Sequence, residues 1–140
     1  MSKAQDRLHA RACRLLGIRP DAIRLVGPSE WRAIVGEGVS RNLGIANMVT
    51  ARTGKQPPVV YVRRGQAFDT YVHEVLHHLF PSRPHWWVFA AAWKLAGSYS
   101  YGYGHALSAT TERRIESKPG LRALCHKAAQ RRGWDNLIAQ

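Results

Sequence analysis

The pattern His-Glu-x-x-His occupies residues 73–77, where the sequence reads HEVLH. In a helix, residues four apart lie on one face about one turn apart, so the imidazoles of His73 and His77 can bind one metal ion. Neutral imidazole is a good zinc ligand, and the Glu74 carboxylate beside it can take a proton from a water molecule that attacks a carbonyl. The pattern therefore predicts a zinc-dependent hydrolytic site; surface histidines on a solvated helix are the alternative interpretation.

A catalytic zinc ion needs a third protein ligand, because its fourth position is left to water or substrate. His85 is the first candidate, since it follows His77 by eight residues and the intervening Pro-Ser-Arg-Pro turn can fold it back over the metal. His105, in a glycine-rich segment that can approach closely, is the second candidate. Glu112 and Glu116 come next, because carboxylates also bind catalytic zinc. For each candidate the alternative is an ordinary loop histidine or a surface glutamate.

A tyrosine- and glycine-rich segment, SYSYGYGH, occupies residues 98–105. Hydrolysis of a peptide bond needs donors that stabilise the oxyanion, and zinc supplies most of that polarisation. Tyr103 and His105 are the preferred additional donors. A lid or packing role for these side chains is the alternative, because loops of this composition commonly cover sites without taking part in the chemistry.

Apolar periodicity predicts the elements that position these residues. Apolar side chains recur at three- and four-residue steps from Phe68 to Leu79, which predicts a helix that carries the His-Glu-x-x-His pattern and ends before Pro81. Runs rich in β-branched residues at 45–52 and 59–62, around a Gly-bearing turn, predict a β-hairpin before it. A short strand is also predicted over 23–26. Further helices are predicted over 3–16, 31–35 and 85–96, from 108 or 110 to 117, and over 121–132. Ser29 is the expected N-cap of the second of these, and a Pro-Gly break precedes the last.

Length and composition fit one domain spanning residues 1–140, of which 45% are hydrophobic and 21% charged. The first residues mix charge into every turn and contain no apolar signal segment. The longest strongly apolar stretch, 86–93, is far below the roughly 20 residues that a membrane span needs. We therefore expect a soluble, cytoplasmic protein without membrane contact, in which Cys13 and Cys125 stay reduced.

Basic residues outnumber acidic ones by 21 to 9, which gives a formal net charge of +12. An excess of this size makes DNA or another polyanion a candidate partner, because Lys and Arg bind phosphates and neighbouring aromatic side chains can stack on bases. A solvated basic surface is the alternative interpretation. The candidate contact residues are the arginine pairs Arg63 and Arg64, Arg113 and Arg114, and Arg131 and Arg132.

Residues 73–97, HEVLHHLFPSRPHWWVFAAAWKLAG, resemble the zincin metallopeptidases, most closely the SprT-like and WLM-type group. In that group the His-Glu-x-x-His pattern is followed by a short turn and by a histidine that precedes an aromatic-containing helix. The resemblance implies that His73, His77 and His85 bind zinc and that Glu74 is the general base. The chain differs from the group in a longer gap before the third histidine and in having no Cys-rich zinc ribbon.

The resemblance also bears on the substrate. It implies that the hairpin ending at residues 61 and 62 supplies the zincin edge strand, which binds an extended peptide backbone by strand addition. SprT-like proteases act on protein crosslinked to DNA, and the basic character of this chain is consistent with such a substrate.

These observations predict a single-domain α+β fold of zincin type, with a small, mostly antiparallel sheet packed on the 68–80 helix and additional C-terminal helices. The predicted function is zinc-dependent hydrolysis of a protein or peptide, acting near DNA. The alternative is a nucleic-acid-binding or interaction module whose zinc is structural, which needs a fourth protein ligand from His105, Cys125 or His126. The presence of Glu74 favours the enzyme, because a structural site has no need of that carboxylate.

Overall fold

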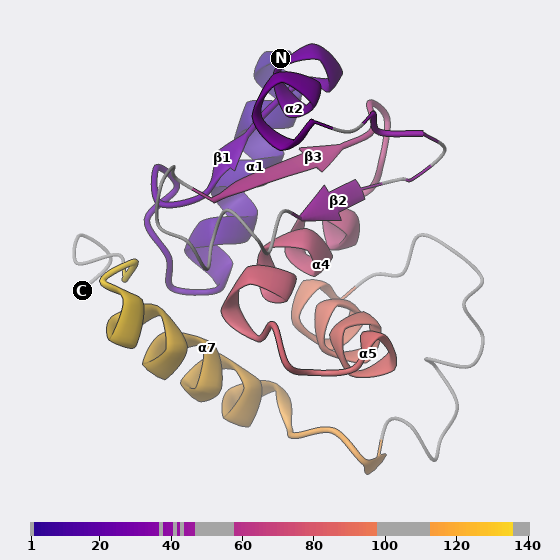
Figure 1. Cartoon of the computed structure of the whole chain (residues 1–140). Coiled ribbons are helices and arrows are strands. Elements are labelled where there is room, and N and C mark those ends of the chain that lie inside the picture. Colours follow the sequence, from indigo (N-terminus) through magenta and orange to yellow (C-terminus); the bar gives the residue numbers. More distant parts are fainter. Residues whose placement is uncertain are drawn as a thin grey trace.

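Strand β3 (Val59–Val62) is the central strand of a three-stranded sheet in the computed structural model, which describes residues 2–36, 38–40, 42, 44–46, 58–97 and 113–135. It pairs in parallel with β1 (Arg24–Leu25) and antiparallel with β2 (Gly44–Ala46) (Figure 1). All four β3 residues are buried, as expected for a short β-branched strand covered on both faces.

The sheet is mixed, so the prediction of a mostly antiparallel sheet is wrong. The antiparallel pairing of the predicted hairpin is confirmed for β2 and β3, while residues 47–57 between them lie outside the described residues. The sequence predicted a strand at the position of β1 but not its parallel pairing with β3. More than thirty residues separate the two strands, and local periodicity carries no information on which strands pair over that distance.

Helices cover both faces of the sheet (Figure 1). On one face lies α2 (Pro28–Val35), whose buried Trp31 packs in a small cluster with Val26, Val59 and Tyr61. On the other face, α4 (Phe68–Leu79) packs against β2 and β3, and α1 (Lys3–Leu15) packs against α4. The larger core lies between α4, its neighbouring helices and this face of the sheet.

Helices α4 and α5 (His85–Ala96) carry the predicted site, and both sequence predictions are confirmed. Helix α4 ends at Phe80, directly before Pro81, whose ring cannot continue a helix. Helix α5 begins after Pro84, which caps it in an extended conformation, and ends at Gly97 in the left-handed conformation. The two helices pack closely together, so the short turn between them returns the start of α5 to the C-terminal half of α4.

Helix starts were predicted less well than helix bodies. The predicted Ser29 cap of α2 is wrong, because that helix begins at Pro28 with Gly27 as N-cap. Helix α7 (Lys118–Arg132) begins three residues before the predicted start, with Ser117 as a side-chain cap and Pro119 in its first turn. Proline is tolerated there because a first-turn amide has no partner within the helix, so the Pro-Gly pair does not delay the helix. The predicted helix from 108 or 110 to 117 lies largely outside the described residues.

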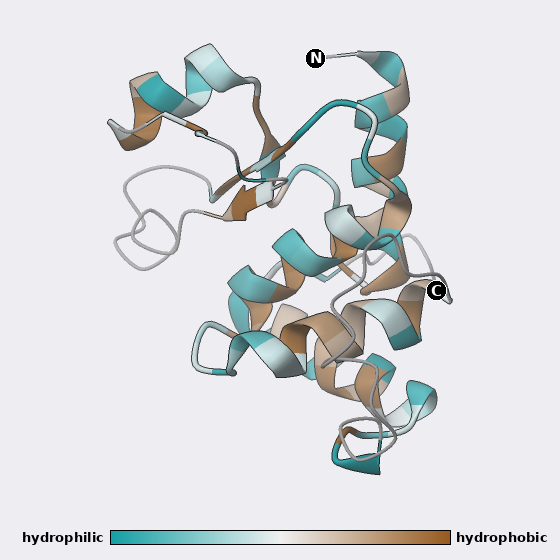
Figure 2. Cartoon of the chain, turned by 90° about the vertical axis from the view of Figure 1, so that its right-hand side faces the viewer, coloured by the Kyte–Doolittle hydropathy of each residue, from teal (hydrophilic) through white to brown (hydrophobic). Residues whose placement is uncertain are grey.

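The described residues therefore form a single α+β domain of five helices and a three-stranded sheet. Figure 2 shows hydrophobic and hydrophilic residues along each helix, as expected for helices with one buried face. No helix within the described ranges has both the length and the apolar character that crossing a membrane requires.

Candidate metal centre

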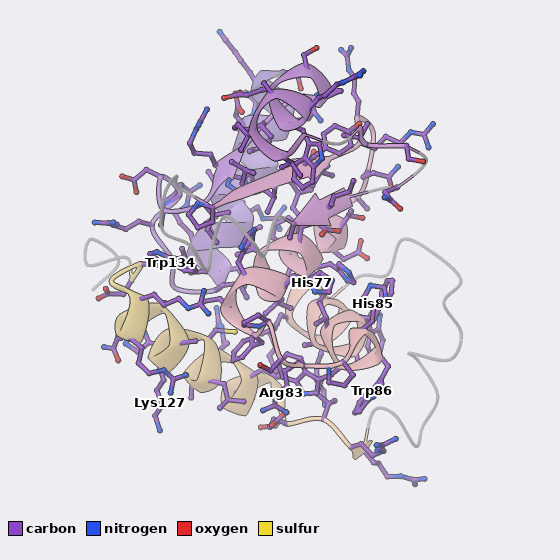
Figure 3. All side chains as sticks on the ribbon, in the orientation of Figure 1. His77, Arg83, His85, Trp86, Lys127 and Trp134 are labelled. Atoms are coloured by element: carbon purple, nitrogen blue, oxygen red, sulfur yellow. The ribbon has the colours of Figure 1, made fainter. Side chains whose placement is uncertain are left out.

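Three histidine side chains converge where α4 meets the start of α5. The Nε2 atom of His73 lies 3.0 Å from Nε2 of His77 and 3.1 Å from Nε2 of His85. The candidate ligand atoms of the three residues all lie within 4.8 Å of one another. Figure 3 shows His77 and His85 side by side at the junction of the two helices. The structure thus brings together the three histidines that the sequence predicted as zinc ligands.

The arrangement of these nitrogens is compatible with a shared metal ion. A neutral imidazole nitrogen has either one proton or one lone pair, so Nε2 of His73 can make one good hydrogen bond, yet it faces two other Nε2 atoms. Two nitrogens bound tetrahedrally to zinc at about 2.0–2.1 Å lie about 3.3–3.4 Å apart. A small closing or opening of the side chains therefore suffices to bind the ion.

Burial keeps the imidazoles of His73 and His77 neutral, whereas His85 is exposed. Loss of solvation, with a smaller contribution from the charges of His77 and His85, lowers the pKa of His73 from 6.5 to about 2. Loss of solvation, followed by the charges of His85 and His78, lowers the pKa of His77 to about 4. Metal binding needs unprotonated imidazole, so near neutral pH His73 and His77 already have the form that binds zinc.

Glu74 follows His73 on α4 and is buried, with 5% of the residue exposed. Burial raises its pKa from 4.5 to about 8, because the charged form loses its hydration. A nearby divalent cation acts in the opposite sense and favours the carboxylate. Glu74 therefore has the kind of perturbed pKa that is common among acid–base groups.

Phe89 is a site residue that the sequence analysis missed. Its ring centroid lies 4.4 Å from that of His73 and 4.5 Å from that of His85, so it packs against two of the three histidines. Residues four apart on a helix share a face, and this spacing from His85 was the available signal. By packing on both rings, Phe89 limits their rotation and covers one side of the cluster.

Two other buried histidines have structural contacts. Nε2 of His78 lies 3.0 Å from the carbonyl oxygen of Val59, which connects α4 to the central strand. Nε2 of His9 lies 2.6 Å from the carbonyl oxygen of Ile23. His78 therefore has a packing role, and its direction differs from that of its neighbour His77, which belongs to the histidine cluster.

The alternative ligands do not join the cluster among the described residues. Glu116 instead accepts a hydrogen bond from the indole of Trp87 at 3.3 Å, and its carboxylate lies 3.8 Å from the Arg83 guanidinium. Cys125 is buried in the core and His126 is exposed on α7, so the predicted four-ligand site with either of them is not assembled. Tyr103, His105 and Glu112 lie outside the described residues.

The strand next to the cluster is β2, not the end of β3. Sequence analysis assigned the substrate-binding edge to the hairpin ending at residues 61 and 62, but those residues lie in the central strand. Strand β2 pairs with β3 on one side, and within the described part of the chain no strand pairs with its other side. The backbone of Gly44 in β2 lies directly against the Glu74 side chain. The edge that faces the site is therefore supplied by Gly44–Ala46.

The predicted arginine pairs are exposed. Arg63 and Arg64 lie in the turn between β3 and α4. Arg113 and Arg114 precede α7, and the Arg114 guanidinium lies over the Trp86 ring at 4.5 Å.

The chain was compared with protein-family models, with curated proteins and with solved structures. None of them matches it. The interpretation of the site therefore depends on the residues and geometry described above.

Proposed function

We propose that this protein is a zinc-dependent peptidase with a zincin-type site, in which His73, His77 and His85 bind the metal and Glu74 is the general base. The observation that carries the proposal is the convergence of the Nε2 atoms of these three histidines, with the buried Glu74 next to His73 in the sequence. Three protein ligands leave one position for water or substrate, which is the arrangement of a catalytic zinc site. When bound, zinc supplies a Lewis acid that polarises the scissile carbonyl and lowers the pKa of water.

Glu74 performs the proton transfers in this proposal. Its carboxylate takes a proton from the attacking water as the oxygen adds to the carbonyl carbon, and the carboxylic acid then gives that proton to the leaving amine. Burial raises the pKa of Glu74 to about 8 in the metal-free chain, and a bound divalent cation would lower it toward the range in which one group can accept a proton and then donate it. His73 and His77 are neutral near pH 7 and hold no competing proton.

The edge of β2 is the proposed place for the substrate backbone. An extended peptide can add to an unpaired strand edge through main-chain hydrogen bonds. Gly44 on this edge contacts Glu74, so a peptide bound there runs past the general base. Main-chain recognition of this kind admits many sequences, and side-chain preferences come from the neighbouring surfaces.

Two substitutions and a control test the activity. Glu74→Gln keeps the shape of the side chain and all three histidines, so the variant should bind one zinc ion and lose at least about 100-fold in hydrolysis of a denatured protein such as casein. His77→Ala should lose both zinc and hydrolysis. His126→Ala removes an exposed histidine of α7 and should match the wild type. An active Glu74→Gln protein would contradict the proposal.

A polyanion-binding role is the second proposal, and helix α7 is the observation that favours it. Within Lys118–Arg132 there are five Lys and Arg residues and no acidic residue. None of the five forms an ion pair with a described residue, since the ion pairs found involve Arg19, Arg24 and Arg83. Figure 3 shows Lys127 extending from α7 away from the rest of the chain. All five side chains are exposed, and exposed cations without an ion pair to a described residue fit phosphate contact, for example with DNA.

The salt dependence of DNA binding distinguishes a contact surface on α7 from attraction by the overall positive charge of the protein. Substituting Arg122, Lys127 and Arg131 by Ala should weaken binding to a DNA duplex and reduce the slope of log K against log[salt] by about 2.7. The matched control replaces three exposed cations of α1, Lys3, Arg7 and Arg14, and has the same net charge. The control should bind like the wild type; equal losses in both variants would contradict a role for α7.

A further inference from the structure

Gly44 occupies a position where the structure has no room for a side chain. A Cβ atom added to Gly44 would lie 2.6 Å from Oε2 of Glu74, 2.8 Å from its Cγ and 2.9 Å from its Cδ. These separations are far below van der Waals contact between the same atoms. The Glu74 side chain therefore occupies the volume that a side chain at position 44 would need.

Backbone conformation does not explain this glycine. Among the described glycines, positive φ angles occur at Gly17, Gly36, Gly65, Gly97 and Gly133. Gly44 is absent from that set and lies in a regular strand, whose conformation any residue adopts. Close approach is left as the physical reason. At Gly17 and Gly120 an added Cβ would lie no closer than 3.3 Å to another residue, and at Gly36, Gly38, Gly65, Gly97 and Gly133 it would meet nothing within 4 Å.

The strand cannot withdraw from Glu74 without losing its place in the sheet. Gly44 pairs with Val62 and Ala46 pairs with Val60, which fixes the register of β2 on the central strand. Alternate residues of a strand face the same side, so Gly44 and Ala46 share a face. Ala46 packs against the core on the α4 side, while Ile45 packs against the cluster around Trp31 on the opposite side. Two small residues thus allow β2 to lie directly on α4.

We infer that Gly44 is a positioning residue for Glu74: the missing side chain lets β2 hold the carboxyl group in one place beside the three histidines. The inference rests on the proposed function, because it assigns to Gly44 the placement of the general base. A methyl group at position 44 must turn the Glu74 side chain away or push β2 off α4. In either case the histidines keep their places on α4 and α5, so metal binding and placement of the base are separable.

The test is a double-mutant cycle that needs no turnover. Affinity for a peptide hydroxamate, which chelates zinc and hydrogen-bonds to a carboxylate beside the metal, is measured on the zinc-loaded chain. Gly44→Ala should keep one zinc ion and lower this affinity about tenfold, the size of one hydrogen bond to a charged group. In the Glu74→Gln background, Gly44→Ala should change the affinity less than twofold. Gly38→Ala is the matched control, because an added Cβ there meets nothing within 4 Å.

Each outcome decides the inference. Wild-type affinity in Gly44→Ala, an equal loss in both backgrounds, loss of zinc, or failure of the zinc-loaded wild type to bind the hydroxamate would each overturn it. If Gly44→Ala does not fold, the Gly44→Ala/Glu74→Ala variant should fold again, because the clashing side chain is gone; an unfolded double variant also overturns the inference. A wild-type chain that binds zinc and the hydroxamate but cleaves no peptide overturns the proposed function alone.

Discussion

Replacing Glu74 by Gln should stabilise the metal-free protein in a manner that depends on pH. Burial raises the pKa of this carboxyl group from 4.5 to about 8. Between these two pH values the folded chain holds a proton on Glu74 that the unfolded chain has released. Folding therefore takes up a proton in this range, and the contribution of Glu74 to the free energy of unfolding falls as pH rises from 4.5 to 8. Glutamine does not titrate, so the free energy of unfolding of the variant does not decrease with pH in this way.

The size of the effect follows from the shift. Each bound proton changes the free energy of unfolding by about 1.4 kcal/mol per pH unit. At pH 7 the solution lies 2.5 units above the pKa of 4.5 that Glu74 has without burial. The free energy of unfolding of the wild type is therefore about 3 kcal/mol lower at pH 7 than at pH 4.5 through this group. The difference in stability between Glu74→Gln and the wild type should grow by this amount from pH 4.5 to 7. The neighbouring histidines titrate in both proteins and cancel in the difference.

Urea unfolding in the presence of a chelator, at half-unit steps from pH 4.5 to 8, measures this difference. Zinc should abolish the pH-dependent part, because a divalent cation beside the carboxylate lowers its pKa and removes the proton from the folded state as well. A difference in stability that stays constant with pH in the metal-free protein would refute the account of Glu74 as a buried, desolvated carboxyl group.

Three further predictions concern His85, His9 and the two cysteines. His85→Ala should lower zinc affinity at least about 100-fold in competition with a chelator, because two ligands remain, whereas His126→Ala should leave it unchanged. Burial lowers the pKa of His9, so as the pH falls the unfolded chain takes up a proton before the folded chain does. The free energy of unfolding should therefore decrease as the pH drops below 6.5. The variant His9→Gln keeps a donor for the nearby carbonyl, and urea unfolding at acid pH should show a smaller decrease for it. Burial raises the pKa of Cys13 and Cys125 to about 12, so neither thiol should react with a thiol reagent at pH 8 until urea unfolds the chain, and fast labelling of the native protein would contradict their burial.

Local patterns were sufficient to predict the part of the site that α4 and α5 carry. The bounds of both helices follow from apolar periodicity and from the prolines and glycine at their ends. The turn from Pro81 to Pro84 is short, so His85 had to return near His77, and this prediction is confirmed by the convergence of their ring nitrogens. These features depend on residues fewer than fifteen positions apart.

The sheet side of the site was not predictable in the same way. Which strand lies at the edge depends on the parallel pairing of β1 with β3, a contact between residues far apart in sequence. That pairing places β3 in the centre and β2 beside α4. The contact of Gly44 with Glu74 follows from this arrangement, and a single glycine in a strand-like run gives no sign of its neighbour. Donor residues between 98 and 112 lie outside the described part of the chain, and their predicted roles stay predictions.

The coordination shell of the metal tests the proposed function most directly. Zinc-loaded protein is examined by X-ray absorption at the zinc edge and by anomalous scattering from crystals. The account predicts one zinc ion bound by Nε2 of His73, His77 and His85 at about 2.0–2.1 Å, with one water oxygen as the fourth ligand. Four protein ligands, a different set of residues, or no zinc bound at the histidine cluster would contradict it.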